Sequence, residues 1–240
     1  SETDFYNHAS VLDKYKETKP SDKIYDFVCS INEGDWNSHV RRLDVAVKWL
    51  NFMAVRMKLK ILVIGSLQKR GFAESITCID FQPWHVFLDH IQSARYLFNS
   101  SEYDASPRII IESMLLNVPV LLNKNILGGW KYIHPKTGAF FDPNANIART
   151  VTRFLRNHRK YTPQAWVKDH VDTQQSKNSL ANFLNSLFCL RWDQIVDGFV
   201  YVGRNPTQLK DTHAKIIKGY GISNDMMYEL PELLALPTDH

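Results

Sequence analysis

The fold of this chain is decided by the stretch Tyr96-Leu-Phe-Asn-Ser-Ser-Glu-Tyr-Asp-Ala-Ser-Pro-Arg-Ile-Ile-Ile-Glu112. Its first three residues form an apolar run that predicts a buried strand, and residues 99–106 are polar, as in a loop. Pro107 predicts the start of a helix over 108–116, because proline is favoured in a first helical turn. Such a strand, polar loop and helix N-terminus bind phosphates and sugars at the carboxyl ends of parallel strands.

Two acids bracket the end of this stretch. Asp104 lies on the expected loop, and Glu112 lies eight residues later, near the end of the first helical turn. A carboxylate placed there can accept hydrogen bonds from a vicinal diol such as ribose. The backbone around Ser106, Pro107, Arg108 and Ile109 would face an anion or sugar hydroxyls, since the first amides of a helix lack partners within it. The alternative is that Asp104 and Ser106 only cap the helix and that Glu112 is solvated.

Three motifs in this region resemble one known family. They are Asp-Ala-Ser-Pro-Arg-x-x-x-Glu over 104–112, Asn-Val-Pro-Val-Leu over 117–121, and Gly128-Gly129. Their order is similar to that in the nucleotide-sugar half of GT-B glycosyltransferases of the family-4-like type, over residues 23–160. That family usually has Glu at both ends of its acid-x7-acid motif, so Asp104 is a departure. Short relatives in large viruses of algae are similar as well.

The resemblance implies roles for these residues. Asp104 and Glu112 would be the catalytic pair, with Glu112 on the ribose and Asp104 on the sugar. Lys124 would reach the diphosphate, and the turn Gly128-Gly129 would turn its amides toward the same anion. The alternative for the turn is a loop that only packs.

Other expected loops contribute further candidates for donor binding. The resemblance implies basic residues after the first strand, where Arg41 and Arg42 are nearest, although each could instead lie on a solvated helix face. Gly65 would let the chain pass close to a ligand, unless it is an ordinary strand-end turn. Gln82 follows the third strand, whose loop lies beside the base in the family, and Phe81 and Trp84 flank it.

The whole chain reads as an α/β protein with a doubly wound parallel sheet, the Rossmann-like half of a GT-B glycosyltransferase with extra C-terminal helices. A single long helix is expected over 39–57, with Ser38 as its N-cap. Strands alternate with helices and are expected at 25–31, 59–65, 76–81, 96–98, 118–122 and 139–141.

Three segments are expected along the chain. Residues 1–22 are polar and predict a linker, residues 23–190 the nucleotide-sugar-binding domain, and residues 191–240 an extension that packs on it or leads to another domain. Helices are expected at 163–171, 177–188 and 207–218.

Composition limits the possible function classes. The 240 residues are 44% hydrophobic, which allows a sizeable core, and the net charge of +4 is too small to argue for nucleic acid. The three cysteines have no zinc-binding spacing and are typical of a reduced, cytoplasmic protein. No apolar run is long enough for a transmembrane segment. We therefore expect no metal and no cofactor beyond the donor substrate.

These observations predict a metal-independent glycosyltransferase acting on a glycan or glycoprotein acceptor. The donor is expected to be a UDP-sugar from family frequency, with a deoxyhexose such as rhamnose for a viral relative, and further domains of the same polypeptide could supply the acceptor site. One alternative is a metal-dependent GT-A enzyme, because Glu102-Tyr-Asp104 has the acid-x-acid form. Others are a non-catalytic nucleotide-sugar-binding module and a structural domain without a ligand.

Overall fold

The computed structural model describes residues 23–31, 35–65 and 71–171, together with positions 11–13, 15, 178 and 182. The helix expected over 207–218 lies outside the described residues, as does nearly all of the helix expected over 177–188. The segment boundaries proposed for the two ends of the chain therefore stay predictions.

Six parallel strands form one sheet in the order β3-β2-β1-β4-β5-β6, which confirms the predicted doubly wound α/β class. The strands are β1 Tyr25–Ser30, β2 Ile61–Ile64, β3 Thr77–Ile79, β4 Ala94–Asn99, β5 Val120–Asn123 and β6 Gly138–Phe141. The chain moves outward from β1 to β3 and then returns to place β4 on the other side of β1. The point where strand order reverses, between β1 and β4, is where ligands bind in open α/β sheets.

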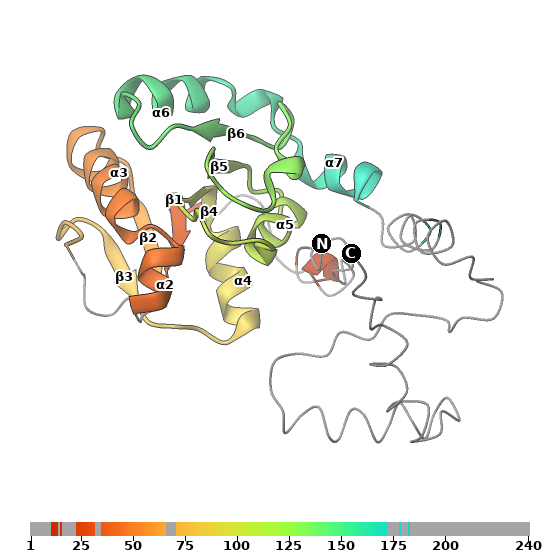
Figure 1. Cartoon of the computed structure of the whole chain (residues 1–240), viewed down its shortest axis with the longest axis horizontal. Coiled ribbons are helices and arrows are strands. Elements are labelled where there is room, and N and C mark those ends of the chain that lie inside the picture. The colour runs from red at the N-terminus through yellow and green to blue at the C-terminus, as the bar shows by residue number, and fades with distance from the viewer. Residues whose placement is uncertain are drawn as a thin grey trace, which may run out of the picture. The chain divides into compact units, whose positions relative to one another are not determined.

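Helices cover both faces of the sheet (Figure 1). They are α2 Asp35–Val40, α3 Leu43–Arg56, α4 Trp84–Gln92, α5 Arg108–Leu115, α6 Ile147–Arg156 and α7 Pro163–His170, with short 3-10 helices η2 Trp130–Tyr132 and η3 His158–Lys160. Helices α3 and α6 pack on the face that carries Phe27 and Phe98, and α4, α5 and α7 pack on the face that carries Val28 and Leu97. Because both faces are covered, every residue of β2 and β5 is buried.

The helix α5 and its approach agree with the sequence prediction. Pro107 immediately precedes the helix, and the chain leaves it at Asn117, which adopts a left-handed conformation with φ 57°. Strand β4 begins two residues earlier than expected, at Ala94, because that residue pairs with Tyr25 of β1. No helix among the described residues combines the length and apolar content needed to cross a membrane.

The prediction of a single helix over 39–57 is wrong, because the structure has two helices there. Helix α2 already starts at Asp35, so Ser38 lies inside it instead of capping it, and α3 starts only at Leu43. Between them Arg42 is left-handed, with φ 51° and ψ 63°, a conformation that costs about 1–2 kcal/mol for an L-residue. The periodicity of apolar residues continues through this break, so we attribute the break to tertiary contacts of residues 40–42 with the loop after β4.

Candidate functional site

The loop after β4 is fixed by the ends of two strands. Asn99, the last residue of β4, accepts a hydrogen bond at its side-chain oxygen from the backbone N–H of Ser101 (2.9 Å). Asn123, the last residue of β5, donates from its side-chain amide to the carbonyl of Ser100 (2.9 Å). Both asparagines are buried. Loop 100–106 is thus held at the carboxyl edge of the sheet, as the strand–loop–helix pattern predicts.

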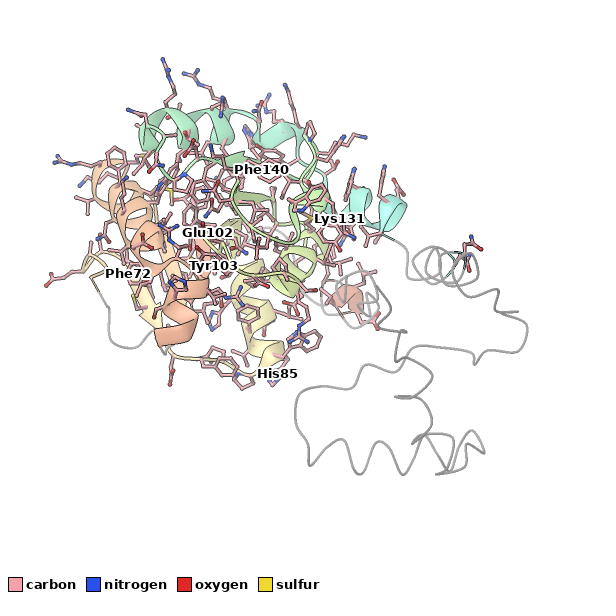
Figure 2. The ribbon with its side chains drawn as sticks, in the orientation of Figure 1. Phe72, His85, Glu102, Tyr103, Lys131 and Phe140 are labelled. Atoms are coloured by element: carbon pink, nitrogen blue, oxygen red, sulfur yellow. The ribbon has the colours of Figure 1, made fainter. Side chains whose placement is uncertain are left out.

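The same loop is joined to the break between α2 and α3. The backbone N–H of Glu102 donates to the carbonyl of Val40 (3.1 Å), and the Ser100 hydroxyl donates to the carbonyl of Arg41 (2.6 Å). Tyr103 stacks on His39 of α2 with ring centroids 5.0 Å apart. Figure 2 shows Glu102 and Tyr103 close to α2. These contacts place the two arginines beside the acids of the loop.

Both arginines form ion pairs with carboxylates. The Arg41 guanidinium pairs with Asp104 and also donates to the Ser101 hydroxyl (3.3 Å). Arg42 pairs with Glu102 and with Asp44, and its hydrogen bond holds the pKa of Asp44 below the ordinary value. The cluster therefore holds two guanidinium groups against three carboxylates, which leaves no surplus of positive charge.

Glu112 is buried, with 5% of its surface exposed, which excludes the alternative of a solvated helix residue. Its Oε1 accepts a hydrogen bond from the indole Nε1–H of Trp84, the first residue of α4 (2.9 Å). A carboxylate is costly to bury unless it is hydrogen-bonded, so this contact helps explain how Glu112 is tolerated there.

The glycine pair packs against the loop that carries Asp104. The Gly128 N–H donates to the carbonyl of Asp104 (2.9 Å), and a Cβ atom at Gly128 would lie 1.8 Å from the carbonyl oxygen of Ala105. Gly129 is left-handed, with φ 77°, and a Cβ there would lie 2.7 Å from Pro107. The Gly128 amide is thus engaged within the chain, which differs from the expectation that both amides face an anion.

Residues 106–109 form the entry to α5. The Ser106 N–H donates to the Asp104 carboxylate (3.2 Å) within the loop, and the N-cap of α5 is Pro107, without a side-chain capping hydrogen bond, so the capping alternative is not supported. Arg108 is exposed and Ile109 partly buried. The side-chain carboxylate of Asp104 thus contacts Ser106 and Arg41, while its backbone carbonyl accepts a hydrogen bond from Gly128.

The remaining candidates lie on neighbouring loops of the same edge. Gly65, at the end of β2, has φ 93° and donates to the carbonyl of Ile79 (2.9 Å). Gln82 follows β3, and its amide donates to the carbonyl of Asp80 (3.1 Å). On the other side, Lys124 leaves β5 and pairs with Asp142 (2.6 Å), which lowers the pKa of that carboxyl group. The structure thus joins Asp104 to Arg41 and Gly128, whereas Gly65, Gln82 and Lys124 follow other strands of the same sheet.

Two contacts of the candidate site were missed by sequence reasoning. Trp84 was expected only near the base, but it binds Glu112, and no local pattern could indicate a contact across 28 residues. The acid-x-acid motif Glu102-Tyr-Asp104 is used to pair Arg42 and Arg41. Among the residues that the structure describes, no group of three or more His, Cys, Asp or Glu side chains is arranged to hold a metal ion.

Comparison with known proteins identifies the fold through structure. No protein-family model and no curated protein sequence matches the chain. The crystal structure of TarM matches 68% of this chain with a TM-score of 0.55 at 13% identity. A mutant of S. aureus TarM in complex with fondaparinux, alpha-GlcNAc-glycerol and UDP matches 67% with a TM-score of 0.52 at 12% identity. The alpha,alpha-trehalose 6-phosphate synthase from Burkholderia multivorans matches 81% with a TM-score of 0.55 at 11% identity.

The chain spans only part of these structures. The match covers 36% of each TarM chain and 50% of the trehalose 6-phosphate synthase. Identities this low show a shared fold alone, and that fold is the Rossmann-like half of GT-B glycosyltransferases, as the motifs predicted.

Proposed function

We propose that this domain binds a nucleoside-diphosphate sugar and takes part in transferring its sugar to a glycan or glycoprotein acceptor. The observation that supports this most is the buried Glu112 carboxylate, with Asp104 eight residues before it, at the carboxyl edge of a parallel sheet. A UDP-sugar is the proposed donor, and the UDP in the TarM mutant complex of the same fold supports that choice.

Each part of the donor has a proposed partner. Glu112 would accept hydrogen bonds from the ribose hydroxyls, because an ionised carboxylate only accepts and a diol can donate twice. Asp104 and the amides that open α5 would bind the sugar, where the positive end of the helix dipole also favours the charge of the adjacent phosphate.

The diphosphate would depend on amides more than on free cations. Arg41, Arg42 and Lys124 already pair with carboxylates. A guanidinium group has five N–H donors, so Arg41 can keep Asp104 and still donate to a phosphate oxygen. The Gly129 amide makes no hydrogen bond within the described part of the chain and is the proposed second donor. Stabilising the leaving diphosphate is the main electrostatic task in sugar transfer.

Binding to the variant Glu112→Gln tests this proposal. Calorimetry with UDP-sugars and GDP-sugars should show roughly tenfold to hundredfold weaker binding, because a hydrogen bond to a charged group is worth about 1.5–3 kcal/mol. Glu74→Gln is the matched control, since Glu74 is exposed on the loop before β3. Unchanged affinity in Glu112→Gln would remove Glu112 from the site, and no binding by the wild-type chain would refute the donor assignment.

A second candidate is a nucleotide-sugar-binding module without turnover. The chain spans only 36% to 50% of the matched structures, and the rest of those proteins has no counterpart in the match. Slow hydrolysis of the donor would favour an enzyme, whereas saturable binding alone would favour the module. We propose that hydrolysis or transfer is independent of metal and therefore survives EDTA.

A further inference from the structure

Two tryptophans of this domain use their indole N–H in different ways. Trp49 of α3 is fully buried and donates to the carbonyl of Pro143 (3.3 Å). Trp84 is 45% exposed and donates to the side chain of Glu112. A half-exposed indole contributes less to the core, so the contact with Glu112 needs an explanation other than packing.

The contact joins two helices at the carboxyl edge of the sheet. Trp84 is the first residue of α4, and Glu112 lies in α5, which packs against α4. Figure 2 shows His85, the next residue along the chain, at the outer end of α4. The half-exposed indole of Trp84 thus donates to a carboxylate that is almost entirely buried.

The chemistry of the pair fixes the direction of the hydrogen bond. An indole N–H can only donate, so the Oε1 atom of Glu112 must accept, and the rigid ring leaves the carboxylate little freedom to turn. Functional groups are held in productive geometry by such supporting hydrogen bonds, and loss of the support loosens the site while leaving its composition unchanged.

We propose that Trp84 is a positioning residue that holds the Glu112 carboxylate toward the ribose and thereby makes the site prefer ribonucleotides to 2′-deoxyribonucleotides. This inference rests on the proposed function of Glu112. A site built to bind a substrate hydroxyl rejects the analogue that lacks it, because the buried polar group is then left without its partner. Without Trp84 the Glu112 carboxylate could turn to another partner, and the preference for ribonucleotides over 2′-deoxyribonucleotides would fall.

The experiment compares two ligand pairs and three proteins. UDP and GDP, each with its 2′-deoxy form, are titrated into wild type, Trp84→Phe and Trp166→Phe by calorimetry. Trp84→Phe keeps an aromatic face but removes the donor, and it should weaken ribonucleotide binding roughly fivefold to tenfold and 2′-deoxyribonucleotide binding less, since only the 3′-hydroxyl remains there for Glu112. Trp166, on α7, stacks on His134 and His170, so its variant should keep both affinities.

A double variant shows whether Trp84 acts through Glu112. In the Glu112→Gln background, Trp84→Phe should cause little further loss, because the group that it positions is already altered. A full additional loss would mean that Trp84 contacts the nucleotide by itself and would overturn the proposal. So would an unchanged preference for ribose in Trp84→Phe. If wild type binds nucleotides without preferring ribose, the proposed role of Glu112 fails first.

A measurement on the wild-type chain does not depend on whether the variants fold. The indole N–H of Trp84 should exchange with solvent more slowly than that of Trp130, which is 56% exposed, when both resonances are followed by NMR. Exchange as fast as that of Trp130 would show that the hydrogen bond to Glu112 is absent in solution and would overturn the proposal.

Discussion

The substitution Gly128→Ala tests how the glycine pair is packed. The new Cβ atom would lie 1.8 Å from the carbonyl oxygen of Ala105 and 2.8 Å from its Cα. Both atoms belong to the backbone, so no side-chain rotation can make room. The loop that carries Gly128 must move away from the loop that carries Asp104, and the hydrogen bond between them is lost.

The size of the effect follows from these two changes. Overpacking costs about 1–3 kcal/mol, and the lost hydrogen bond between Gly128 and Asp104 adds about 0.5–1.5 kcal/mol. Reduced freedom of the unfolded chain returns about 0.4–1 kcal/mol. We expect a net loss of about 0.5–4 kcal/mol in the free energy of unfolding, at about 2–4 °C in Tm per kcal/mol for a domain of this size.

Urea denaturation of Gly128→Ala and Gly71→Ala separates the crowding effect from backbone strain. A Cβ atom at Gly71 would make only an ordinary contact with Val47, at 3.4 Å, so that variant bears only the cost of φ +84°, about 1–2 kcal/mol. Both variants should lose stability, but only Gly128→Ala should also weaken nucleotide-sugar binding, since it displaces the loop of Asp104. A free energy of unfolding within about 0.5 kcal/mol of wild type for Gly128→Ala would refute the reasoning.

Three further predictions concern stability and reactivity. Arg41→Gln leaves Asp104 without its ion-pair partner and should lower the free energy of unfolding, measured in urea, by about 1.5–3 kcal/mol. The control Arg95→Gln should lower it by at most about 0.5 kcal/mol, because Arg95 is 61% exposed and lies 3.8 Å from Asp26. Equal losses in the two variants would contradict this ranking. Trp49→Ala should cost about 3–5 kcal/mol, because the side chain is fully buried, and a loss below about 1 kcal/mol would show that the site is not closely packed. Burial raises the pKa of the Cys29 thiol to about 12, so a thiol reagent at pH 8 should label it only after unfolding, and rapid labelling of the native chain would argue against this burial. Because the thiol loses its proton at lower pH in the unfolded chain, the contribution of Cys29 to stability should fall as the pH rises above the ordinary pKa of 9.0.

Local patterns predicted the elements of this domain well. The apolar run before Asn99 forms β4, and Pro107 precedes α5, because strand burial and proline geometry depend mainly on neighbouring residues. The alternation of strands with helices gave the parallel sheet, since crossover connections of this length favour parallel pairing.

The break between α2 and α3 could not be predicted in the same way. The apolar period and the helix-forming residues continue through Arg41 and Arg42. What opposes the continuous helix is a set of contacts with loop 100–104, about 60 residues away, including the ion pairs of both arginines. These contacts offset the cost of one left-handed residue, and tertiary structure thus overrides local propensity there.

The sequence by itself determined the α/β class. It also placed one acid, Asp104, on a loop and the other, Glu112, in the helix that follows, because these features depend on residues close together in the chain. Only the tertiary structure decided what those acids contact. Asp104 meets Arg41 across 63 residues, and Glu112 meets Trp84 across 28. A hydrogen bond or ion pair depends on distance in space, and the order of the strands in the sheet sets that distance.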